Sequence, residues 1–578
     1  MELLDPIYTK KRECQDCHKC IRECPVKAIR VQDGFSQVMP GFCVMCGSCV
    51  LSCPNSAIQV RNDLPAAQEL MTSGRKVIAS LDPAFVAQFP GIRPAQLIHA
   101  IKQLGFAAVS ETALGAQQVS ANVSALMRSE PKRVWISSAC PSVVDFIAMY
   151  HPECLSHVIG VMSPLLAHCT TLRSHYGEGI AIVFFGPCLA KKKDADLHPD
   201  LLDAALTFED LERWLNLKSI RLAEIIDGPE DRFEPEEARD GALYAIEGGM
   251  APALVAGAAD SGMQFMSFSG LANVERALKD IPEWQPDQSI FMEMSACAGS
   301  CINGPRATSG TSIARRRYDV IQYARSACEL PRKASPNIAW RYAASPIAPK
   351  KYGDLPLREA LRWVGQYSVE DELNCGGCGY PSCRDFAHAL LAGNAERMMC
   401  ATYTRKLAQK KANALLQRMP SAVVIVGEDL EIIEYNPSFS KLFPAEEAAP
   451  KEPDGTPARG VLPFSNLFRR VLESGEDILS HDIRFGRRIL NTSIFTIEPN
   501  TVIGGIFRDI TEPTFQKEQI IGRAQQVIEK NLKTVQQIAY LLGENAADSE
   551  VILNSIVSSF RPEEVDDSDA EEDHAELR

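Results

Sequence analysis

FMEMSACAGSCINGP, residues 291–305, is the stretch on which the rest of this 578-residue chain depends. It begins as an apolar run and ends in a small-residue loop that carries Cys297 and Cys301. Two cysteines cannot complete a metal site, so other segments must supply further ligands. Cys140, in SSACPS, and Cys188, in FFGPCLAKKKDAD, lie in similar Pro-marked loops. We therefore expect an iron–sulfur cluster held by these four cysteines.

The region around this stretch reads as an α/β domain. Residues 66–345 alternate apolar runs of strand length, at 76–81, 133–137 and 180–185, with amphipathic helical runs at 94–104 and 208–215. This alternation predicts parallel sheets. Ligands of such sheets bind beyond the carboxyl ends of the strands. Cys140 and Cys188 each follow a predicted strand, which places both at that edge.

In order and spacing, the three cysteine segments resemble the signature segments of the FeFe-hydrogenase catalytic domain. Residues 75–345 are therefore identified as a diverged member of that family. The resemblance implies an H-cluster, in which a 4Fe-4S cubane on Cys140, Cys188, Cys297 and Cys301 is bridged through Cys301 to a diiron unit carrying CO and CN.

The resemblance also assigns the surroundings of the diiron unit. Lys191 would donate a hydrogen bond to a cyanide, a role suited to a compact ammonium. Asp194 would pair with this lysine where the family has Glu. Ser163-Pro164 would line the cyanide side, and Asp82-Pro83-Ala84 would supply backbone donors there.

The departures from the family concern proton transfer. Ala139 stands where the family has the cysteine that passes protons to the diiron site, and a methyl group cannot carry a proton. An ungapped match places Asn122, Val123 and Leu126 where active enzymes have a glutamate path. Gly186 and Ser295 replace two flanking methionines. This pattern resembles the sensory FeFe-hydrogenase-like proteins, which turn over slowly.

A relative that holds only a 4Fe-4S cluster is the alternative. Lys191 and Ser163 argue against it, because a bare cubane needs neither residue.

The N-terminus contains an internal repeat. Its C-x2-C-x2-C-x3-C-P run recurs 29 residues later, and CPVKAIRV matches CPNSAIQV. This is the spacing of a two-cluster ferredoxin, in which the fourth cysteine of each run serves the other cluster, and its role is electron relay. Zinc is the alternative for paired C-x2-C motifs, but the third cysteine, the proline and the duplication favour iron–sulfur. The predicted ligand sets are Cys14, Cys17, Cys20 and Cys53 for one cluster, and Cys43, Cys46, Cys49 and Cys24 for the other.

A further constellation lies at residues 375–400. Its C-x2-C-x4-C-x16-C spacing resembles the small 4Fe-4S domain of electron-transfer and corrinoid-enzyme subunits, with zinc as the alternative. Residues 384–398 have a helical pattern that would bring the last cysteine back. The predicted ligands are Cys375, Cys378, Cys383 and Cys400. Three of the 19 cysteines remain, Cys154, Cys169 and Cys328, and we interpret these as buried structural thiols.

The C-terminal third reads as a signalling module. Residues 401–418 are helical and polar, and residues 412–512 resemble a PAS domain through their Tyr-Asn-Pro and Asp-Ile-Thr-Glu motifs. That domain has no cysteine to bind flavin, and we expect His481 to be a surface residue. From residue 514 a heptad pattern predicts a coiled coil or a helix docked on the PAS sheet. Its apolar positions are Ile521, Ile528, Val535 and Leu542, with Ala524 and Ile538 between them.

The predicted fold is multidomain α/β. Its parts are a two-cluster ferredoxin domain (1–65), an α/β hydrogenase-like domain with parallel sheets (66–345), a small helical 4Fe-4S domain (346–405), a linker helix with an α+β PAS domain (406–512), a C-terminal helical output segment (513–560) and an acidic tail (561–578). The last 17 residues include nine acidic ones, which predicts disorder.

Composition limits the partners. A net charge of −14 argues against nucleic acid, and we interpret the charge runs at 191–193 and 315–317 as solvated or locally paired. No apolar run is long enough to span a membrane and the charged N-terminus is no signal peptide, so we expect a cytoplasmic protein.

The expected function is a hydrogen or redox sensor with slow ferredoxin-hydrogenase chemistry. Its expected partners are H2, ferredoxin or another redox partner, a signalling protein that reads the PAS domain, and a second copy in a homodimer. No histidine in residues 514–560 could accept phosphate, so the output must pass through a partner. The alternatives are a working hydrogenase and an electron-transfer or scaffold protein without diiron.

Overall fold

The computed structural model describes residues 4–129, 132–238, 240–258, 263–307, 310–325, 334–348, 350–444, 464–511 and 526–535. The chain divides into two compact units, Met1–Met399 and Cys400–Arg578. Among the described residues, no helix is both long and apolar enough to cross a membrane.

The N-terminal repeat is also a structural repeat. In each half the first two cysteines lie in a loop, and the third lies in the short helix that follows. The fourth cysteine caps the C-terminal end of that helix. His18 and Gly47, which precede the two helices, are both in the left-handed region, with φ of 58° and 77°. The elements are β1 (Ile7–Thr9) paired antiparallel with β4 (Ile58–Val60), the hairpin β2 (Ile29–Gln32) and β3 (Phe35–Val38), and the helices α1 (Lys19–Glu23) and α2 (Ser48–Ser52).

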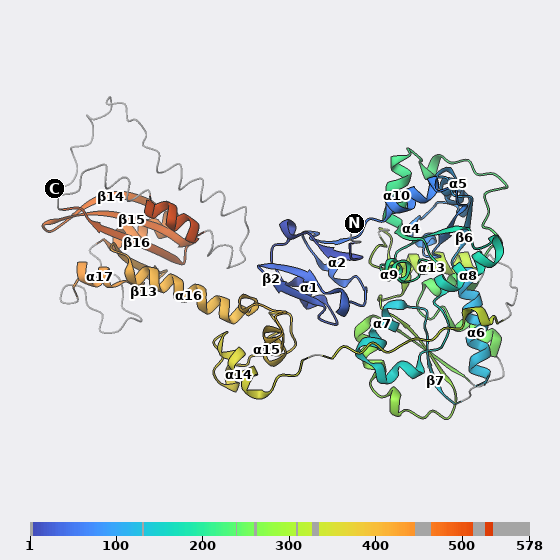
Figure 1. The fold of residues 1–578 in the computed structure, drawn as a ribbon. Coiled ribbons are helices and arrows are strands. Elements are labelled where there is room, and N and C mark those ends of the chain that lie inside the picture. Colours follow the sequence, from blue (N-terminus) through green and yellow to red (C-terminus); the bar gives the residue numbers. More distant parts are fainter. Residues whose placement is uncertain are drawn as a thin grey trace. The chain divides into compact units, whose positions relative to one another are not determined.

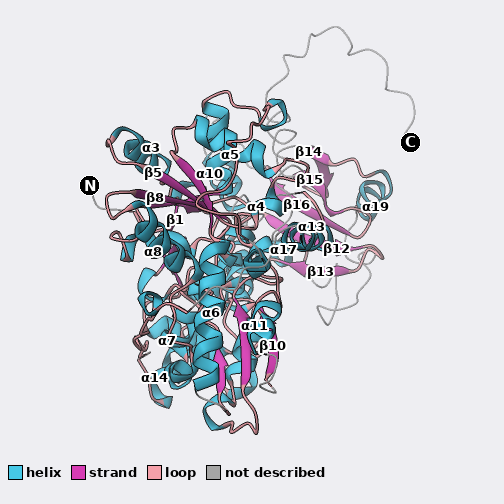
Figure 2. Ribbon diagram, turned by 90° about the vertical axis from the view of Figure 1, so that its right-hand side faces the viewer, coloured by secondary structure: helices cyan, strands magenta, loops and turns pink. Residues whose placement is uncertain are grey.

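The first sheet of the next domain is parallel, in the order β6-β5-β8-β9. Alternate residues of β5 face opposite layers: Val77 and Ala79 pack with α5 and α10, whereas Ile78 packs with α8. Helices therefore cover both faces of these strands (Figure 2). The elements are β5 (Val77–Leu81), β6 (Ala108–Glu111), β8 (Ala181–Gly186), β9 (Ala204–Thr207), α3 (Leu64–Thr72), α4 (Phe85–Gln88), α5 (Pro94–Gln103), α8 (Pro164–Tyr176), α9 (Ala190–Leu197) and α10 (Phe208–Leu217).

A second parallel sheet, in the order β10-β11-β7, forms the other lobe of this domain (Figure 1). Val134 and Met292 face α7 and α12, while Trp135 and Phe291 face α6 and α11. The predicted parallel sheets are confirmed, but the strands before Cys140 and Cys188 belong to separate sheets. The elements are β7 (Val134–Ile136), β10 (Gln264–Ser269), β11 (Ile290–Ser295), α6 (Ala113–Ser129), α7 (Pro141–Tyr150), α11 (Ala251–Ala258), α12 (Leu271–Leu278) and α13 (Ile313–Arg325).

Residues 350–399 form a small helical domain in which α14 (Asp354–Arg362) packs on α15 (Cys383–Leu391). The helix predicted over 384–398 is too long. It ends at Leu391 because Gly393, with φ of 73°, turns the chain. A short 3-10 turn, Arg397–Met399, follows.

The second unit begins with α16 (Ala401–Arg418) and contains an antiparallel sheet in the order β13-β12-β16-β15-β14. This order, with helices between the second and third strands, is that of a PAS domain. Asn436 explains the Tyr-Asn-Pro motif, because its side chain accepts the N–H groups of Phe439 and Val423, both at 2.9 Å. The elements are β12 (Ala422–Gly427), β13 (Ile432–Tyr435), α17 (Pro437–Leu442), α19 (Ser465–Ser474), β14 (Ile478–Phe485), β15 (Arg488–Glu498) and β16 (Val502–Asp509).

Aromatic rings fill the PAS core. Phe439, Phe443, Phe468 and Phe507 contact one another between the helices and the sheet. His481 is exposed on β14, as expected for a surface residue. Of the predicted C-terminal helix, residues 526–535 are helical. Ile521, Ala524, Ile538 and Leu542, like the acidic tail, lie outside the described residues.

Candidate metal centre

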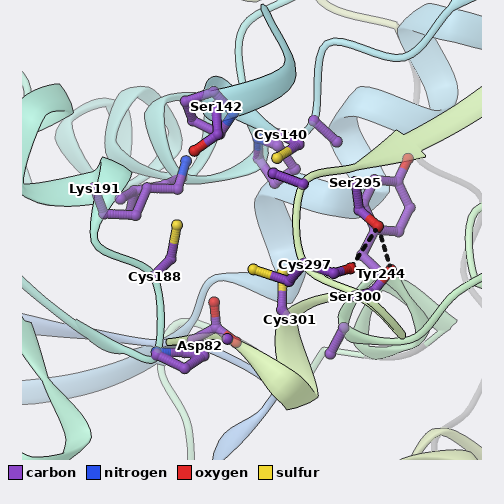
Figure 3. A pocket seen from close by; sticks show the side chains of 18 of the residues that line it. Asp82, Cys140, Ser142, Cys188, Lys191, Tyr244, Ser295, Cys297, Ser300 and Cys301 are labelled. Atoms are coloured by element: carbon purple, nitrogen blue, oxygen red, sulfur yellow. Dashed lines mark hydrogen bonds between the residues drawn. The ribbon is translucent and has the colours of Figure 1, made fainter. Parts of the chain in front are cut away.

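The four cysteines of the α/β domain line one pocket between the two sheets (Figure 3). Cys140 caps α7, and Cys188 lies between β8 and α9. Cys297 follows β11, and Cys301 begins a 3-10 turn, Cys301–Asn303. Each cysteine therefore lies just beyond the carboxyl end of a parallel strand, as the alternation of elements predicts.

The donor set fits an iron–sulfur cluster. Burial raises the pKa of all four thiols, that of Cys188 to about 12, and repulsion among them adds to the effect at Cys188, Cys297 and Cys301. Such thiols keep their protons at neutral pH unless a cation replaces them. The N–H groups of Ala296 and Val143 donate to Cys140, which suits a thiolate ligand.

Lys191 joins two other predicted site residues in one buried network. Its Nζ donates to Asp194 Oδ2 at 3.0 Å and to Ser163 Oγ at 3.2 Å. Ser163 caps α8, and the side chain of Lys191 is only 9% exposed. Burial acts to lower the pKa of Lys191, but the charge of Asp194 and the hydrogen bond to it act in the opposite direction, and the pKa is raised. The ammonium therefore stays charged beside the thiols.

The segment Asp82-Pro83-Ala84 differs from expectation. The N–H of Asp82 donates to Phe185 O, and that of Ala84 donates to Asp82 Oδ1, both at 2.9 Å. Since Pro83 has no N–H, none of the three residues offers a free backbone donor. The pocket instead meets the carboxyl group of Asp82 (Figure 3). Burial raises the pKa of that group to about 6.

The wall around Ala139 lacks the family's relay groups. Ala139 lines the pocket, and its N–H donates to Ser137 Oγ at 3.1 Å. In α6, Asn122 exchanges two hydrogen bonds with the backbone of Ser335, Val123 is core and Leu126 packs on that core. These α6 positions therefore act structurally.

Gly186 and Ser295, the two positions where the resemblance predicts methionine, make different contacts. A Cβ on Gly186 would lie 2.4 Å from the ring of Phe184, which itself lines the pocket, so that ring occupies the space of a larger side chain. The hydroxyl of Ser295 instead bonds to Cys297 O at 3.3 Å and Ser300 Oγ at 3.0 Å, tying the cysteine loop together (Figure 3).

The pocket lining also includes residues that sequence patterns did not indicate, among them Tyr244, Met250 and Glu293. Glu293 accepts the N–H groups of Gly248 and Met250 at 3.0 and 2.9 Å, and burial raises its pKa to about 7. Its charge within the apolar run FMEM is the signal that could have found it. Tyr244 and Met250 come from a region without strong periodicity.

The ferredoxin thiols lie within electrostatic reach of one another, and their division into two ligand sets stays a prediction. The charges acting on Cys20 are those of Cys14, Cys17 and Cys53, whereas Cys46 acts on both Cys24 and Cys43. Backbone N–H groups donate to Cys24, Cys43 and Cys53 at 3.2–3.4 Å. The four cysteine sulfurs that hold a 4Fe-4S cubane each bind a different iron. In agreement with this, no three His, Cys, Asp or Glu in the described part of the chain are placed to share a single ion.

Cys375, Cys378 and Cys383 lie in the small helical domain, and Cys400 is the first residue of the second unit. Cys154 and Cys169 are fully buried, whereas Cys328 lies outside the described residues. The three lysines at 191–193 each pair with a carboxylate, but Lys191 and Lys192 are buried rather than solvated.

In this geometry a four-thiol pocket adjoins the N-terminal cysteine repeat, through Cys46 and Gly47. Residues 75–305 match the family model of the iron only hydrogenase large subunit, C-terminal domain, and residues 6–54 match a 4Fe-4S dicluster domain. A family model for an Fe-S cluster matches residues 371–413, which include all four cysteines of the third set. The chain therefore carries a domain of the iron only hydrogenase large subunit, C-terminal type, together with a 4Fe-4S dicluster domain.

Two curated relatives are similar to this chain. Iron hydrogenase 1 of Clostridium pasteurianum is 23% identical over 42% of this chain, and the match spans half of that relative's length. The periplasmic [Fe] hydrogenase large subunit of Nitratidesulfovibrio vulgaris is 24% identical over 52% of this chain and 85% of its own length.

Two solved structures are also similar. An FeFe-hydrogenase from Chlamydomonas reinhardtii covers 49% of this chain and 100% of its own, at 17% identity and a TM-score of 0.39. The PAS domain of a nitrogen regulation protein from Vibrio parahaemolyticus covers 17% of this chain and 97% of its own, at 22% identity and a TM-score of 0.13.

Proposed function

We propose that this chain is a hydrogen and redox sensor that holds an H-cluster and turns over H2 slowly. One observation carries the proposal: the pocket keeps a charged, fully partnered Lys191 on one wall and has a methyl group, Ala139, on the proton-relay wall. A protein that only held a cubane would have no use for the buried ammonium. An efficient hydrogenase would keep the relay.

The chain's own residues would divide the work as follows. Cys140, Cys188, Cys297 and Cys301 would hold the cluster, and Lys191 would donate to an anionic ligand while Asp194 and Ser163 fix its position. Met250, Phe184 and Pro83 would exclude water from the pocket. An H-cluster bound here would supply reversible H2 cleavage. Ala139 could not move the proton, and loss of a positioned proton donor costs about 10²–10⁴ in rate.

The remaining domains suit a sensor. The ferredoxin and 371–413 segments would exchange electrons with ferredoxin or another redox partner in the cytoplasm. The state of the clusters would then bias the PAS domain. Because aromatic side chains fill the PAS core, that domain is better suited to relaying a rearrangement, in a homodimer or to a signalling partner, than to binding a ligand.

A working hydrogenase is the second candidate, and Glu293 favours it. This carboxyl group lines the pocket, has its pKa raised to about 7 by burial, and accepts from Met250, whose sulfur contacts Ser137 beside Ala139. A carboxyl group of that pKa can exchange protons at neutral pH.

Infrared spectroscopy of anaerobically matured protein tests the proposal, since CO and CN bands report the diiron unit directly. Three accessory clusters and a full H-cluster give about 18 Fe per chain, against about 16 without diiron. Diiron bands with slow H2 evolution support the sensor, and turnover at rates usual for the family supports the enzyme. Equal iron content near 16 with and without maturation, and no bands, would leave only an iron–sulfur scaffold.

A further inference from the structure

The two halves of the N-terminal repeat differ in charge just after the Cys-Pro that ends each run of four cysteines. CPVKAI places Lys27 where CPNSAI has Ser56. The backbone conformation is the same at both, with φ of 52° and 50°. The repeat therefore offers the same site twice, once with a cation and once without.

Lys27 lies at the end of α1 and faces two different cysteine sets. Its Nζ donates to Ile21 O at 2.9 Å and to Arg22 O at 3.2 Å, where the helix carbonyls favour a cation. Burial lowers its pKa, and the charges of Cys24 and Cys378 act in the opposite direction. Lys27 is thus within electrostatic reach of one ferredoxin cysteine and one cysteine of the small helical domain.

The small helical domain is held against this half of the repeat. Arg22 Nη1 donates to Gly377 O at 3.5 Å, and a Cβ on Gly379, which has φ of 92°, would lie 2.8 Å from Ile21 Cγ2. A second contact joins Val31 N to Asn394 O at 3.0 Å. Figure 1 shows α15 beside the ferredoxin domain. These contacts bring the loop with Cys378 close to α1.

The opposite side of the same cysteine set meets the four-thiol pocket. Cys46 lines that pocket, and its charge acts on Cys297. A Cβ on Gly47, which has φ of 77°, would lie only 2.5 Å from Pro305 Cβ, so the two loops touch without room for a side chain. The set Cys24, Cys43, Cys46 and Cys49 therefore faces both neighbours, whereas Cys17 of the other set is exposed.

We propose that the cluster of Cys24, Cys43, Cys46 and Cys49 is a branch point for electrons, with Lys27 as the cation that it shares with the third cluster. With clusters held by these cysteines, each exchange would move one electron from one 4Fe-4S cluster to its neighbour, with no bond or proton moved. The cluster of Cys14, Cys17, Cys20 and Cys53 is then a separate outlet toward external partners. The branch toward the four-thiol pocket rests on the proposed function, whereas the Lys27 branch needs only the accessory clusters.

The test is a potentiometric titration followed by electron paramagnetic resonance on full-length protein made without maturation factors. A cation stabilises the reduced cluster, so Lys27→Ser should lower the reduced-to-oxidised ratio of both the branch-point cluster and the third cluster about tenfold at a fixed potential, a shift of 59 mV. Lys27→Arg should restore both ratios. Cys378→Ala identifies the signals of the third cluster.

Ser56→Lys is the matched control, because it adds the same cation at the equivalent position. It should raise the reduced fraction of the cluster of Cys14, Cys17, Cys20 and Cys53 and leave the third cluster unchanged. With full iron content, a third cluster that does not respond to Lys27→Ser, or that responds equally to Ser56→Lys, overturns the proposal. If Lys27→Ser loses iron, the fallback test uses reduced wild-type protein. There the paramagnetic resonance signals of the branch-point cluster and the third cluster should broaden each other, and the absence of this broadening refutes the branch. Since these samples contain no diiron unit, the outcome is independent of the sensor proposal.

Discussion

The two walls of the four-thiol pocket have different chemistry. On the wall formed by α8 and α9, Lys191, Ser163 and Asp194 satisfy one another within a buried network. On the wall that follows β7, Ala139 offers only a methyl group. In α6, Asn122 is used to hold the backbone of Ser335. The contrast teaches that placing a cation beside the four thiols and offering a proton relay there are separate demands, which separate residues can meet or leave unmet.

The largest expected effect comes from removing Lys191 from the wall formed by α8 and α9. Lys191→Met leaves Asp194 as a buried charge without its partner, and breaking such a pair costs about 3–5 kcal/mol. We expect the matured variant to lose its CO and CN bands and to fall from about 18 to about 16 Fe. Infrared spectra and iron analysis measure this.

Lys193→Met is the control, since Lys193 pairs with Asp145 and its side chain is 29% exposed. It should keep the bands. If Lys191→Met also retains unshifted cyanide bands, Lys191 does not touch the diiron unit and the contrast between the walls disappears.

A second prediction concerns Glu293, an ionisable residue that lines the same pocket as Ala139. Burial raises the pKa of Glu293 from 4.5 to about 7, which corresponds to about 3 kcal/mol against the carboxylate. The protonated form is therefore the stable one, and the stability that Glu293 contributes is complete below pH 4.5 and is lost as the pH rises through 7.

Difference infrared spectroscopy of wild type against Glu293→Gln checks this. A carboxylic C=O band should be present at pH 5, absent from the variant, and titrate with a midpoint near 7. Asp82→Asn should leave that band in place, because Asp82 is a different carboxyl group with its pKa raised to about 6. A carboxylate band that persists at pH 5 would mean that Glu293 is not desolvated.

Sequence patterns located most of this architecture, and the exceptions have physical causes. The cysteine sets, the parallel strands and the Asn436 cap follow from spacing and period, which are local properties. The engaged N–H groups of Asp82 and Ala84 could not be foreseen, because one of them pairs with a neighbouring strand. Phe184 filling the space above Gly186 is likewise a tertiary contact. The charge of Glu293 stands out within its apolar strand, but periodicity alone does not say that the carboxyl group lines the pocket.

Placing a proton-carrying side chain at position 139 should have a smaller effect. Ala139→Cys returns the first relay group, but the positions beyond it in α6 remain Asn122 and Val123. We expect H2 evolution to rise by about tenfold or less, equivalent to about 1.4 kcal/mol in the barrier. Activity assays on matured protein with equal diiron content measure this. Ala139→Ser, with its poorer acid, should raise the rate less. A rise of 10³ would show that the rest of the relay is present by another route.

The smallest expected effect is the influence of the cluster state in the four-thiol pocket on the second compact unit. In sequence, Cys400 and α16 are what connect the two compact units, so a change of cluster state must pass through them to influence the PAS domain. Coupling between distant sites is usually worth about 1–3 kcal/mol, and we expect the lower end. Hydrogen exchange under H2 and under argon should therefore differ in residues 406–418 and 526–535 by a modest change in protection, without unfolding. Cys301→Ala, which removes the predicted bridge to the diiron unit, should abolish the difference. Identical protection under both gases, in protein with proven diiron bands, would mean that the cluster is held but not read by the second unit.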